Sequence, residues 1–184
     1  GSTGTATKPL VEIGILDDAG TLLPANTTGE VAFRSICNFG GYWENPEATA
    51  AAITPDGWFR TGDLGYLDED DYLFIVDRKK DIIIRGGENI SCIEVEDAIY
   101  AHDDVGECSV FGLTDERFGE VPAAVYAIKE GRAAITPAQL RAFLLERIAP
   151  FKVPLEHHIW LTDEALPRLG TQKIDKRTVK ARYA

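Results

Sequence analysis

The sequence predicts an α+β fold: a β-rich first part followed by a smaller part in which helices pack on a sheet. Three observations lead to this prediction. Apolar residues alternate with other residues along much of 11–77, two helix-capping boxes follow, and the charge balance changes between the two parts. Residues 1–77 carry 3 Lys or Arg against 13 Asp or Glu, whereas residues 78–184 carry 16 against 17. We therefore expect two domains, 1–77 and 78–184, with a boundary near 77–81.

The first part is expected to consist mainly of strands. Apolar residues alternate along VEIGI at 11–15 and GEVAFRSI at 29–36, on either side of a DDAG turn. LGYL and YLFIV flank the acidic DEDD turn at 68–71 and are typical of a hairpin. One short helix is expected over NPEATAAAI at 45–53, with Asn45 as its N-cap.

The second part is expected to combine helices with further strands. Ser91 and Glu94 form an S-x-x-E capping box for a helix that ends near His102. Thr136 and Gln139 form a T-x-x-Q box for another helix. DIII, CSVFG, VPAAVYAIK and HHIWL are expected to be strands, and a basic tail follows them.

Composition narrows the class of protein. The chain has 45% hydrophobic and 27% charged residues, no run of 18 apolar residues and no leader pattern, so we expect a globular cytoplasmic protein. A net charge of -11 argues against nucleic acid or an anionic membrane as the main partner. Residues 168–184, however, hold six cations against one Asp, which suits a phosphate-bearing ligand or an exposed helix. Because Met is absent, we expect a piece of a longer polypeptide.

The three cysteines are not expected to carry chemistry. Cys37, Cys92 and Cys108 are odd in number, widely spaced and form no CxxC pair, so neither a disulfide framework nor a zinc site is indicated. We expect small buried thiols. No HExxH or similar motif is present, and the predicted site includes no metal ligand.

Four segments together resemble a known family. They are GYWENPEATAAAI at 41–53, DGWFRTGDLGYLDEDDYLFIVDRKKDIIIRGGENI at 56–90, IEVEDAI at 93–99 and LPRLGTQKIDK at 166–176. In this order they resemble the carboxyl-terminal part of the adenylate-forming acyl-CoA synthetases, and GGENI resembles the fatty-acid and related ligases. The resemblance implies a distorted barrel-like β subdomain that ends a large amino-terminal domain, then a mobile α+β domain with a three-stranded type of sheet.

The resemblance also implies a two-step reaction. A fatty or related carboxylic acid attacks the α-phosphate of ATP, with Mg²⁺ assisting, to form an acyl-adenylate and pyrophosphate. The thiol of coenzyme A then displaces AMP, and the small domain rotates between the steps. Because the phosphate loop and the acyl pocket lie upstream in the family, these 184 residues alone are expected not to adenylate any acid.

Two residues match the nucleotide-binding positions of the family. The Asp63 carboxylate of the TGD segment can accept hydrogen bonds from both ribose hydroxyls. The Arg78 guanidinium offers a planar fork of donors for hydroxyl or phosphate oxygens. Taken without the resemblance, Asp63 would stabilise a turn after Gly62, and Arg78 would pair with Asp77 or Asp81.

Three more residues match family positions in the hinge and in the loop that follows it. Lys80 falls at the hinge, where backbone torsions absorb the rotation, although it also fits an exposed lysine in a basic trio. Gly86 and Gly87 fit a loop that comes close to a ligand or adopts positive φ. The resemblance implies that they line the passage for coenzyme A, whereas a tight turn would need no ligand.

Lys173 matches the catalytic lysine of the family, which contacts the carboxylate and the α-phosphate. A placed cation helps when two anions meet, because negative charge grows in the transition state. The alternative is one of six solvated cations in the tail. Gln172 replaces the usual glycine, so we expect a differently shaped or less mobile loop. Acetylation by a lysine acetyltransferase would remove the Lys173 charge, and we expect it to stop adenylation.

Two other functions fit the residues. The first is an adenylation domain that loads a carrier protein. The second is a non-enzymatic α+β module that binds a polyanion with its basic tail, which predicts strongly salt-dependent binding.

Overall fold

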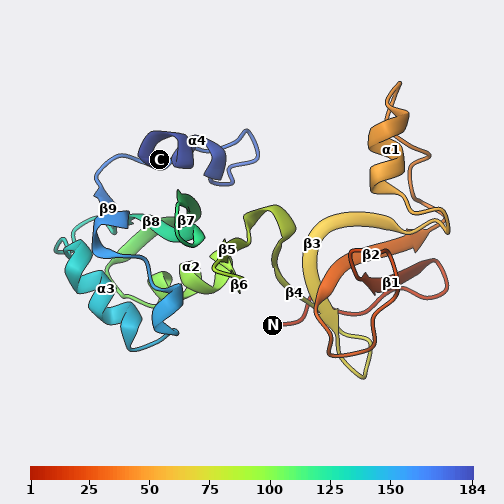
Figure 1. The fold of residues 1–184 in the computed structure, drawn as a ribbon, viewed down its shortest axis with the longest axis horizontal. Helices are drawn as coiled ribbons and strands as arrows, with labels where there is room; N and C mark the ends of the chain where they lie inside the picture. The colour runs from red at the N-terminus through yellow and green to blue at the C-terminus, as the bar shows by residue number, and fades with distance from the viewer. The chain divides into compact units, whose positions relative to one another are not determined.

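The computed structural model describes all 184 residues, which divide into two units, Gly1–Lys80 and Asp81–Ala184. Each unit has its own sheet, and helices accompany both sheets, as Figure 1 shows. The predicted α+β class is therefore confirmed. No helix is long and apolar enough to cross a membrane.

A four-stranded antiparallel sheet forms the first unit. Its strands, in spatial order, are β1 (Val11–Leu16), β2 (Gly29–Ser35), β3 (Phe59–Leu67) and β4 (Leu73–Arg78). The sheet is open: β1 and β4 are its two ends, and only one isolated bridge, Gly4 to Leu73, adds to β4. The expected barrel therefore does not close.

Side chains on opposite faces of this sheet form two small clusters. Ile15, Val31 and Leu73 pack on one face. Leu16 and Ala32 pack with Trp58 in the other cluster, as the period of two along a strand requires. The short helix α1 (Pro46–Ala52) begins after Asn45, whose Oδ1 accepts a hydrogen bond from the Ala48 amide at 2.9 Å. The expected N-cap is therefore confirmed.

The second unit contains a five-stranded sheet rather than the expected three-stranded type. The strands are β5 (Ile83–Arg85), β6 (Glu88–Ile90), β7 (Val105–Asp115), β8 (Gly119–Ile128) and β9 (Ile159–Thr162). β7 and β9 flank the central β8, antiparallel and parallel to it respectively. The β5–β6 hairpin joins β8 at the Arg85–Gly119 pair and supplies the two additional strands.

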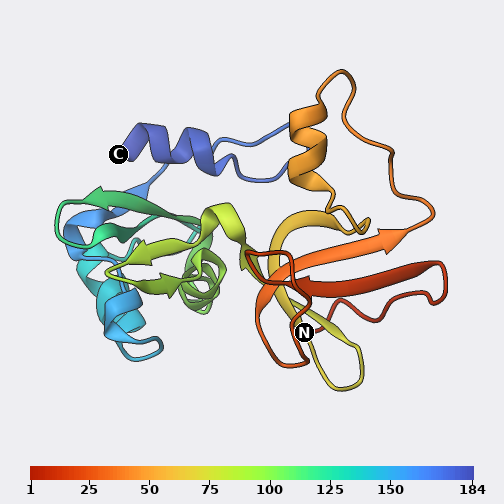
Figure 2. The same cartoon turned by 45° about the vertical axis from the view of Figure 1, so that its right-hand side comes forward.

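Helices cover both faces of this sheet, as Figure 2 shows. α2 (Cys92–Tyr100) and α3 (Pro137–Leu145) pack with Cys108, Val110, Ala124 and Tyr126 on one face. α4 (Lys176–Tyr183) packs on the other face, where Val179 meets Phe111, Ala123 and Val125. Neighbouring residues of β7 and β8 alternate between these two clusters. Both faces of each strand are therefore buried, which explains why both faces are apolar.

The predicted N-caps of α2 and α3 are present, and α3 has the full capping box. The Ser91 hydroxyl accepts a hydrogen bond from the Glu94 amide at 3.1 Å. Thr136 and Gln139 cap each other's backbone amides at 2.8 and 3.2 Å. Each such cap contributes about 1 kcal/mol, so these residues fix where both helices begin.

Two expectations about side chains were wrong. Cys37 is exposed, whereas Cys92 and Cys108 are buried; burial, with the nearby charge of Glu96, raises the pKa of Cys108 to about 12. His157 and His158 lie in a 3₁₀ turn before β9 rather than in the strand, and their ring centroids are 4.2 Å apart. Sequence alternation could not distinguish this turn from the strand that follows it.

Candidate functional site

Asp63 and Arg78 lie opposite each other on two neighbouring strands of the first sheet. They are register partners on β3 and β4, and the Arg78 Nε lies 3.3 Å from the Asp63 Oδ1. The Asp63 side chain is 32% exposed and that of Arg78 is 54% exposed, so both remain accessible. The pair can therefore present an acceptor and a fork of donors to one polar ligand.

The backbone around Asp63 is held on both sides. Gly62 has φ of +75°, a conformation that favours glycine, and its amide donates to the Glu30 carboxylate at 3.3 Å. The Asp63 amide donates to the Thr61 hydroxyl at 3.1 Å, and that hydroxyl donates to the Val31 carbonyl at 2.7 Å. These bonds fix the backbone from which the Asp63 side chain projects before any ligand arrives.

Glu30 is a supporting residue that the sequence did not reveal. Its side chain is buried on β2, where it accepts a bond from Arg60 Nη1 at 2.9 Å and one from Lys79 Nζ at 3.4 Å. A hydrogen bond to Asp18 and the charge of Glu30 raise the pKa of Lys79. A buried carboxylate is tolerated only with such partners. These partners lie 30 and 49 residues away, so no local pattern could have indicated the cluster.

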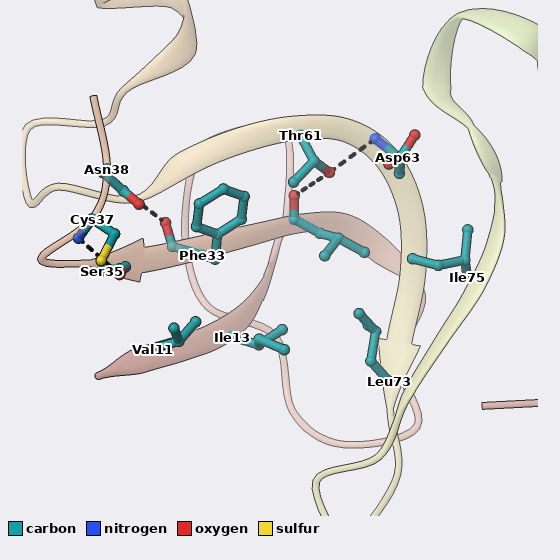
Figure 3. A pocket seen from close by; sticks show the side chains of 11 residues that line it. Val11, Ile13, Phe33, Ser35, Cys37, Asn38, Thr61, Asp63, Leu73 and Ile75 are labelled. Atoms are coloured by element: carbon teal, nitrogen blue, oxygen red, sulfur yellow. Dashed lines mark hydrogen bonds between the residues drawn. The ribbon is translucent and has the colours of Figure 1, made fainter. Parts of the chain in front are cut away.

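A hollow of about 460 Å³ lies over the sheet beside Asp63, and Figure 3 shows its lining. Asp63 and Thr61 supply polar groups on β3, while Ile13, Phe33 and Leu73 make most of the wall apolar. A mostly apolar hollow with a few polar groups is the usual form of a small-molecule site. The arrangement suits a ligand with hydroxyl groups attached to a less polar body.

Gly86 and Gly87 form the two-residue turn between β5 and β6. Their φ angles are +59° and +90°, as the tight hairpin turn between antiparallel strands requires. A β-carbon at Gly86 would lie 3.3 Å from the ring of Phe118, whereas the space around Gly87 is open. The turn alone accounts for both glycines.

Two arginines beside this turn were missed by the sequence analysis. The guanidinium carbons of Arg85 and Arg117 lie 4.1 and 4.9 Å from the centroid of the Phe118 ring. The Gly86 amide donates to the Phe118 carbonyl at 2.8 Å, which fixes the turn against this cluster. Nothing in the sequence placed residues 85 and 117 on one ring, because the contact depends on how β5 meets β8.

Lys80 lies where the two units meet along the chain. It is in a 3₁₀ turn, Lys79–Asp81, and it is the last residue of the first unit. Its side chain is exposed.

Lys173 lies in a small hairpin that precedes α4. Arg168 and Ile174 form a β-bridge, and the Leu169 amide donates to the Lys173 carbonyl at 2.8 Å. The Lys173 side chain is exposed, and its amine forms no hydrogen bond or ion pair. The hairpin therefore presents an uncommitted positive charge.

Gln172 adopts the left-handed conformation, with φ of +67°. The expectation that glutamine would change the shape of this loop by avoiding positive φ was wrong. The glutamine takes the conformation at a cost of about 1–2 kcal/mol, so other contacts of the hairpin must offset it.

The predicted site residues thus occupy four places, of which the turn that contains Lys80 is one. Asp63 and Arg78 form one pair in the first unit, whereas the Gly86–Gly87 turn and the Lys173 hairpin are separate elements of the second. No group of three or more His, Cys, Asp or Glu side chains could hold a metal ion.

Comparison with known proteins shows which family the chain resembles. The family model for the C-terminal domain of AMP-binding enzymes matches residues 94–173. Over this range the chain is similar to the C-terminal domain of AMP-binding enzymes, and solved adenylate-forming enzymes share its fold. The 2-succinylbenzoate–CoA ligase of Geobacillus kaustophilus is 46% identical over 179 residues, which are 96% of this chain and 35% of that relative. This chain therefore spans about a third of the length of the curated relatives that it matches.

Solved structures of adenylate-forming enzymes have the same fold. ATP-bound MatB from Rhodopseudomonas palustris matches with a TM-score of 0.90 and 34% identity, over 100% of this chain and 36% of that one. The amide bond synthetase McbA from Marinactinospora thermotolerans matches with a TM-score of 0.87 and 35% identity, over 100% and 36%. The second structure shows that this fold also occurs in an enzyme described as making amide bonds.

Proposed function

We propose that this chain acts as part of an ATP-dependent acid:CoA ligase. In the first step a carboxylate oxygen bonds to the α-phosphorus of ATP, and the bond to the departing pyrophosphate breaks. In the second step the sulfur of coenzyme A bonds to the acyl carbon, and AMP leaves. The observation that carries this proposal is the exposed, unpartnered Lys173 on a defined hairpin of a chain that resembles this family.

Lys173 is proposed to act in the first step. The attacking carboxylate and the α-phosphate are both anionic, and negative charge on the phosphoryl oxygens must be stabilised as they approach. A free ammonium on a flexible stem can contact both groups. Since the Lys173 amine has no partner within these 184 residues, no ion pair among them has to break before it reaches those groups.

Asp63 and Arg78 are proposed to hold the nucleotide. The Asp63 carboxylate would accept from the two ribose hydroxyls, and Arg78 would donate to a ribose or phosphate oxygen. Their spacing of 3.3 Å and their partial exposure support this role. The bonds that fix Thr61, Gly62 and Asp63 mean that the backbone carrying the acceptor is already fixed, which lowers the entropic cost of binding.

The other predicted residues have proposed roles in the change between the steps. We propose that the backbone near Lys80 is the hinge, since the boundary of the two units falls directly after it. We propose that the Gly86–Gly87 turn lines the passage for coenzyme A, because the open space around Gly87 leaves room for a ligand. Mg²⁺ would accompany ATP, where it would neutralise part of the phosphate charge.

The acid is proposed to be an aromatic carboxylic acid of the 2-succinylbenzoate type. Relatives from Geobacillus kaustophilus and Bacillus cereus, 46% and 38% identical, are both 2-succinylbenzoate–CoA ligases. These names favour that acid over the fatty acid expected from the GGENI segment. Fatty acids are the second class of substrate to be tested.

The test uses the native polypeptide that carries this sequence, supplied with ATP, Mg²⁺ and a panel of acids. We expect acid-dependent pyrophosphate release, and an acyl-CoA product by mass spectrometry when coenzyme A is added, fastest with 2-succinylbenzoate. Parallel reactions replace coenzyme A with simple amines, because McbA is described as an amide bond synthetase. Amide without thioester, or no pyrophosphate with any acid, would refute the proposal.

A further inference from the structure

The side chain of Arg168 ties the Lys173 hairpin to the sheet, and Ile174 also packs against the apolar residues of that face. The Arg168 Nη1 donates to the Gln172 carbonyl at 2.6 Å, across the hairpin. The Arg168 Nη2 donates to the Glu107 carboxylate, which belongs to β7. One guanidinium therefore links the residue before Lys173 to a long strand of the sheet.

Glu107 is itself held in place. Its other carboxylate oxygen accepts a hydrogen bond from the Leu166 amide at 3.4 Å, where the chain enters the hairpin. The side chains of Arg168 and Glu107 are 39% and 30% exposed, so water screens their charges only in part. An arginine with two separate acceptors is more strongly oriented than a lysine would be, because its donors are fixed in one plane.

The other end of the hairpin is fixed separately. The Asp175 carboxylate caps α4 by accepting from the Thr178 amide at 3.2 Å, and the Asp175 amide donates to the Pro167 carbonyl at 2.7 Å. Lys176 then pairs with Glu96 of α2 at 2.8 Å. Because this end is fixed, the hairpin can change shape mainly at residues 169–172. The hydrogen bond from Arg168 to the Gln172 carbonyl spans this segment.

Gln172 is the residue on which the Arg168 contact acts. It is a non-glycine residue in the left-handed region, and its carbonyl is the group that Arg168 binds. Releasing the carbonyl would let Gln172 relax toward negative φ and turn the following peptide, and with it the Cα–Cβ direction of Lys173.

We propose that Arg168 is a positioning residue for Lys173, which acts by holding the Gln172 carbonyl against the Glu107 carboxylate of β7. This inference rests on the proposed function of Lys173 and adds the group that aims it. Displacing a reacting group by about 1 Å can lower a rate about 100-fold, so a tie at the neighbouring residue has a large effect on adenylation.

The test compares four variants with the parent: Arg168→Met, Glu107→Gln, their double variant and Arg182→Met. Methionine keeps the stem of arginine and removes its donors. Arg182→Met is the matched control, since Arg182 forms only a 3.5 Å pair with Glu164 on the exposed side of α4. Two rates are measured in the native polypeptide: acid-dependent pyrophosphate release, and thioester formation from synthetic acyl-adenylate and coenzyme A.

We expect Arg168→Met to lower pyrophosphate release about 10-fold to 100-fold, with thioester formation changed less than about twofold. Glu107→Gln should have a smaller effect in the same direction, and the double variant should be no slower than Arg168→Met. In the 184-residue chain, the amides of Leu169 and Gln172 should exchange hydrogen faster in Arg168→Met, and at the parent rate in Arg182→Met.

Three results would overturn the inference: unchanged pyrophosphate release in Arg168→Met, unchanged amide exchange, or an equal fall of both rates, which would indicate only a loss of folding. Lys173→Ala separates this inference from the proposed function. If Lys173→Ala is inactive in adenylation while Arg168→Met is fully active, the positioning role alone fails. If Lys173→Ala is fully active, the proposed function fails.

Discussion

The two proposed functional side chains follow the same backbone feature in different surroundings. Asp63 comes directly after Gly62, with φ of +75°, and Lys173 comes directly after Gln172, with φ of +67°. Gly62 adopts this conformation without steric cost, whereas Gln172 does not. The first side chain lies within a sheet, and the second lies in an exposed hairpin held by Arg168.

This difference matches the proposed roles of the two groups. Asp63 is paired with Arg78 and fixed by its neighbours, as suits a group that binds one part of a ligand throughout the reaction. The Lys173 amine has no partner, as suits a group needed only while charge develops. A group in an exposed hairpin can also be displaced more easily than one held in a sheet.

A substitution in the core of the second unit is expected to have the largest effect on stability, and to leave the first unit unchanged. Leu140 is fully buried between α3 and the second sheet, so Leu140→Ala should cost about 2–5 kcal/mol. Hydrogen exchange should rise in α3 and β7, while β2 and β3 keep their protection. The control Leu145→Ala lies on the same helix but is 37% exposed, and it should cost about 1 kcal/mol. Equal loss of protection in β2 and β3 would contradict two separate cores.

A smaller effect is expected at the nucleotide pair. Asp63→Ala removes a charged acceptor worth about 1.5–3 kcal/mol, which corresponds to about a 10-fold to 150-fold loss in kcat/KM for ATP. The steady-state rate at varied ATP measures this loss. Asp70→Ala is the control, because Asp70 is an exposed carboxylate of the neighbouring acidic turn. Equal activity of the two variants would argue against a nucleotide role for Asp63.

Substitutions of the residues that precede Asp63 and Lys173 are expected to have the smallest effects on stability. Gly62→Ala should destabilise the first unit by about 1 kcal/mol, because alanine disfavours positive φ. Gln172→Gly should stabilise the second unit by about 0.5–1 kcal/mol, after the greater flexibility of the unfolded glycine chain is subtracted. Thermal unfolding of the variants measures both changes. A destabilising Gln172→Gly would show that its left-handed conformation carries no strain.

Sequence signals predicted the features that depend on nearby residues. The alternation along β1 and β2 and the caps at Asn45, Ser91 and Thr136 were sufficient, because their partners lie within a few residues. β6 was missed, since three residues are too short to show a period. The open first sheet and the fifth strand of the second depend on tertiary pairing, which local patterns do not encode.

The supporting contacts of the site could not be predicted for the same reason. Arg168 and Glu107 are 61 residues apart, and Glu30 and Lys79 are 49 apart. Each of these residues looks like an ordinary surface charge in the sequence. Only the fold brings them together. The resemblance to the family indicated Lys173, but it did not indicate what holds its hairpin.

The most direct test of the account measures the two half-reactions in Lys173→Ala, with Lys180→Ala of α4 as the control. We expect pyrophosphate release to fall about 100-fold to 1,000-fold in Lys173→Ala, since one cation of the site is lost, while thioester formation from the acyl-adenylate is unchanged. Lys180→Ala should behave as the parent. Full pyrophosphate release by Lys173→Ala would contradict the account.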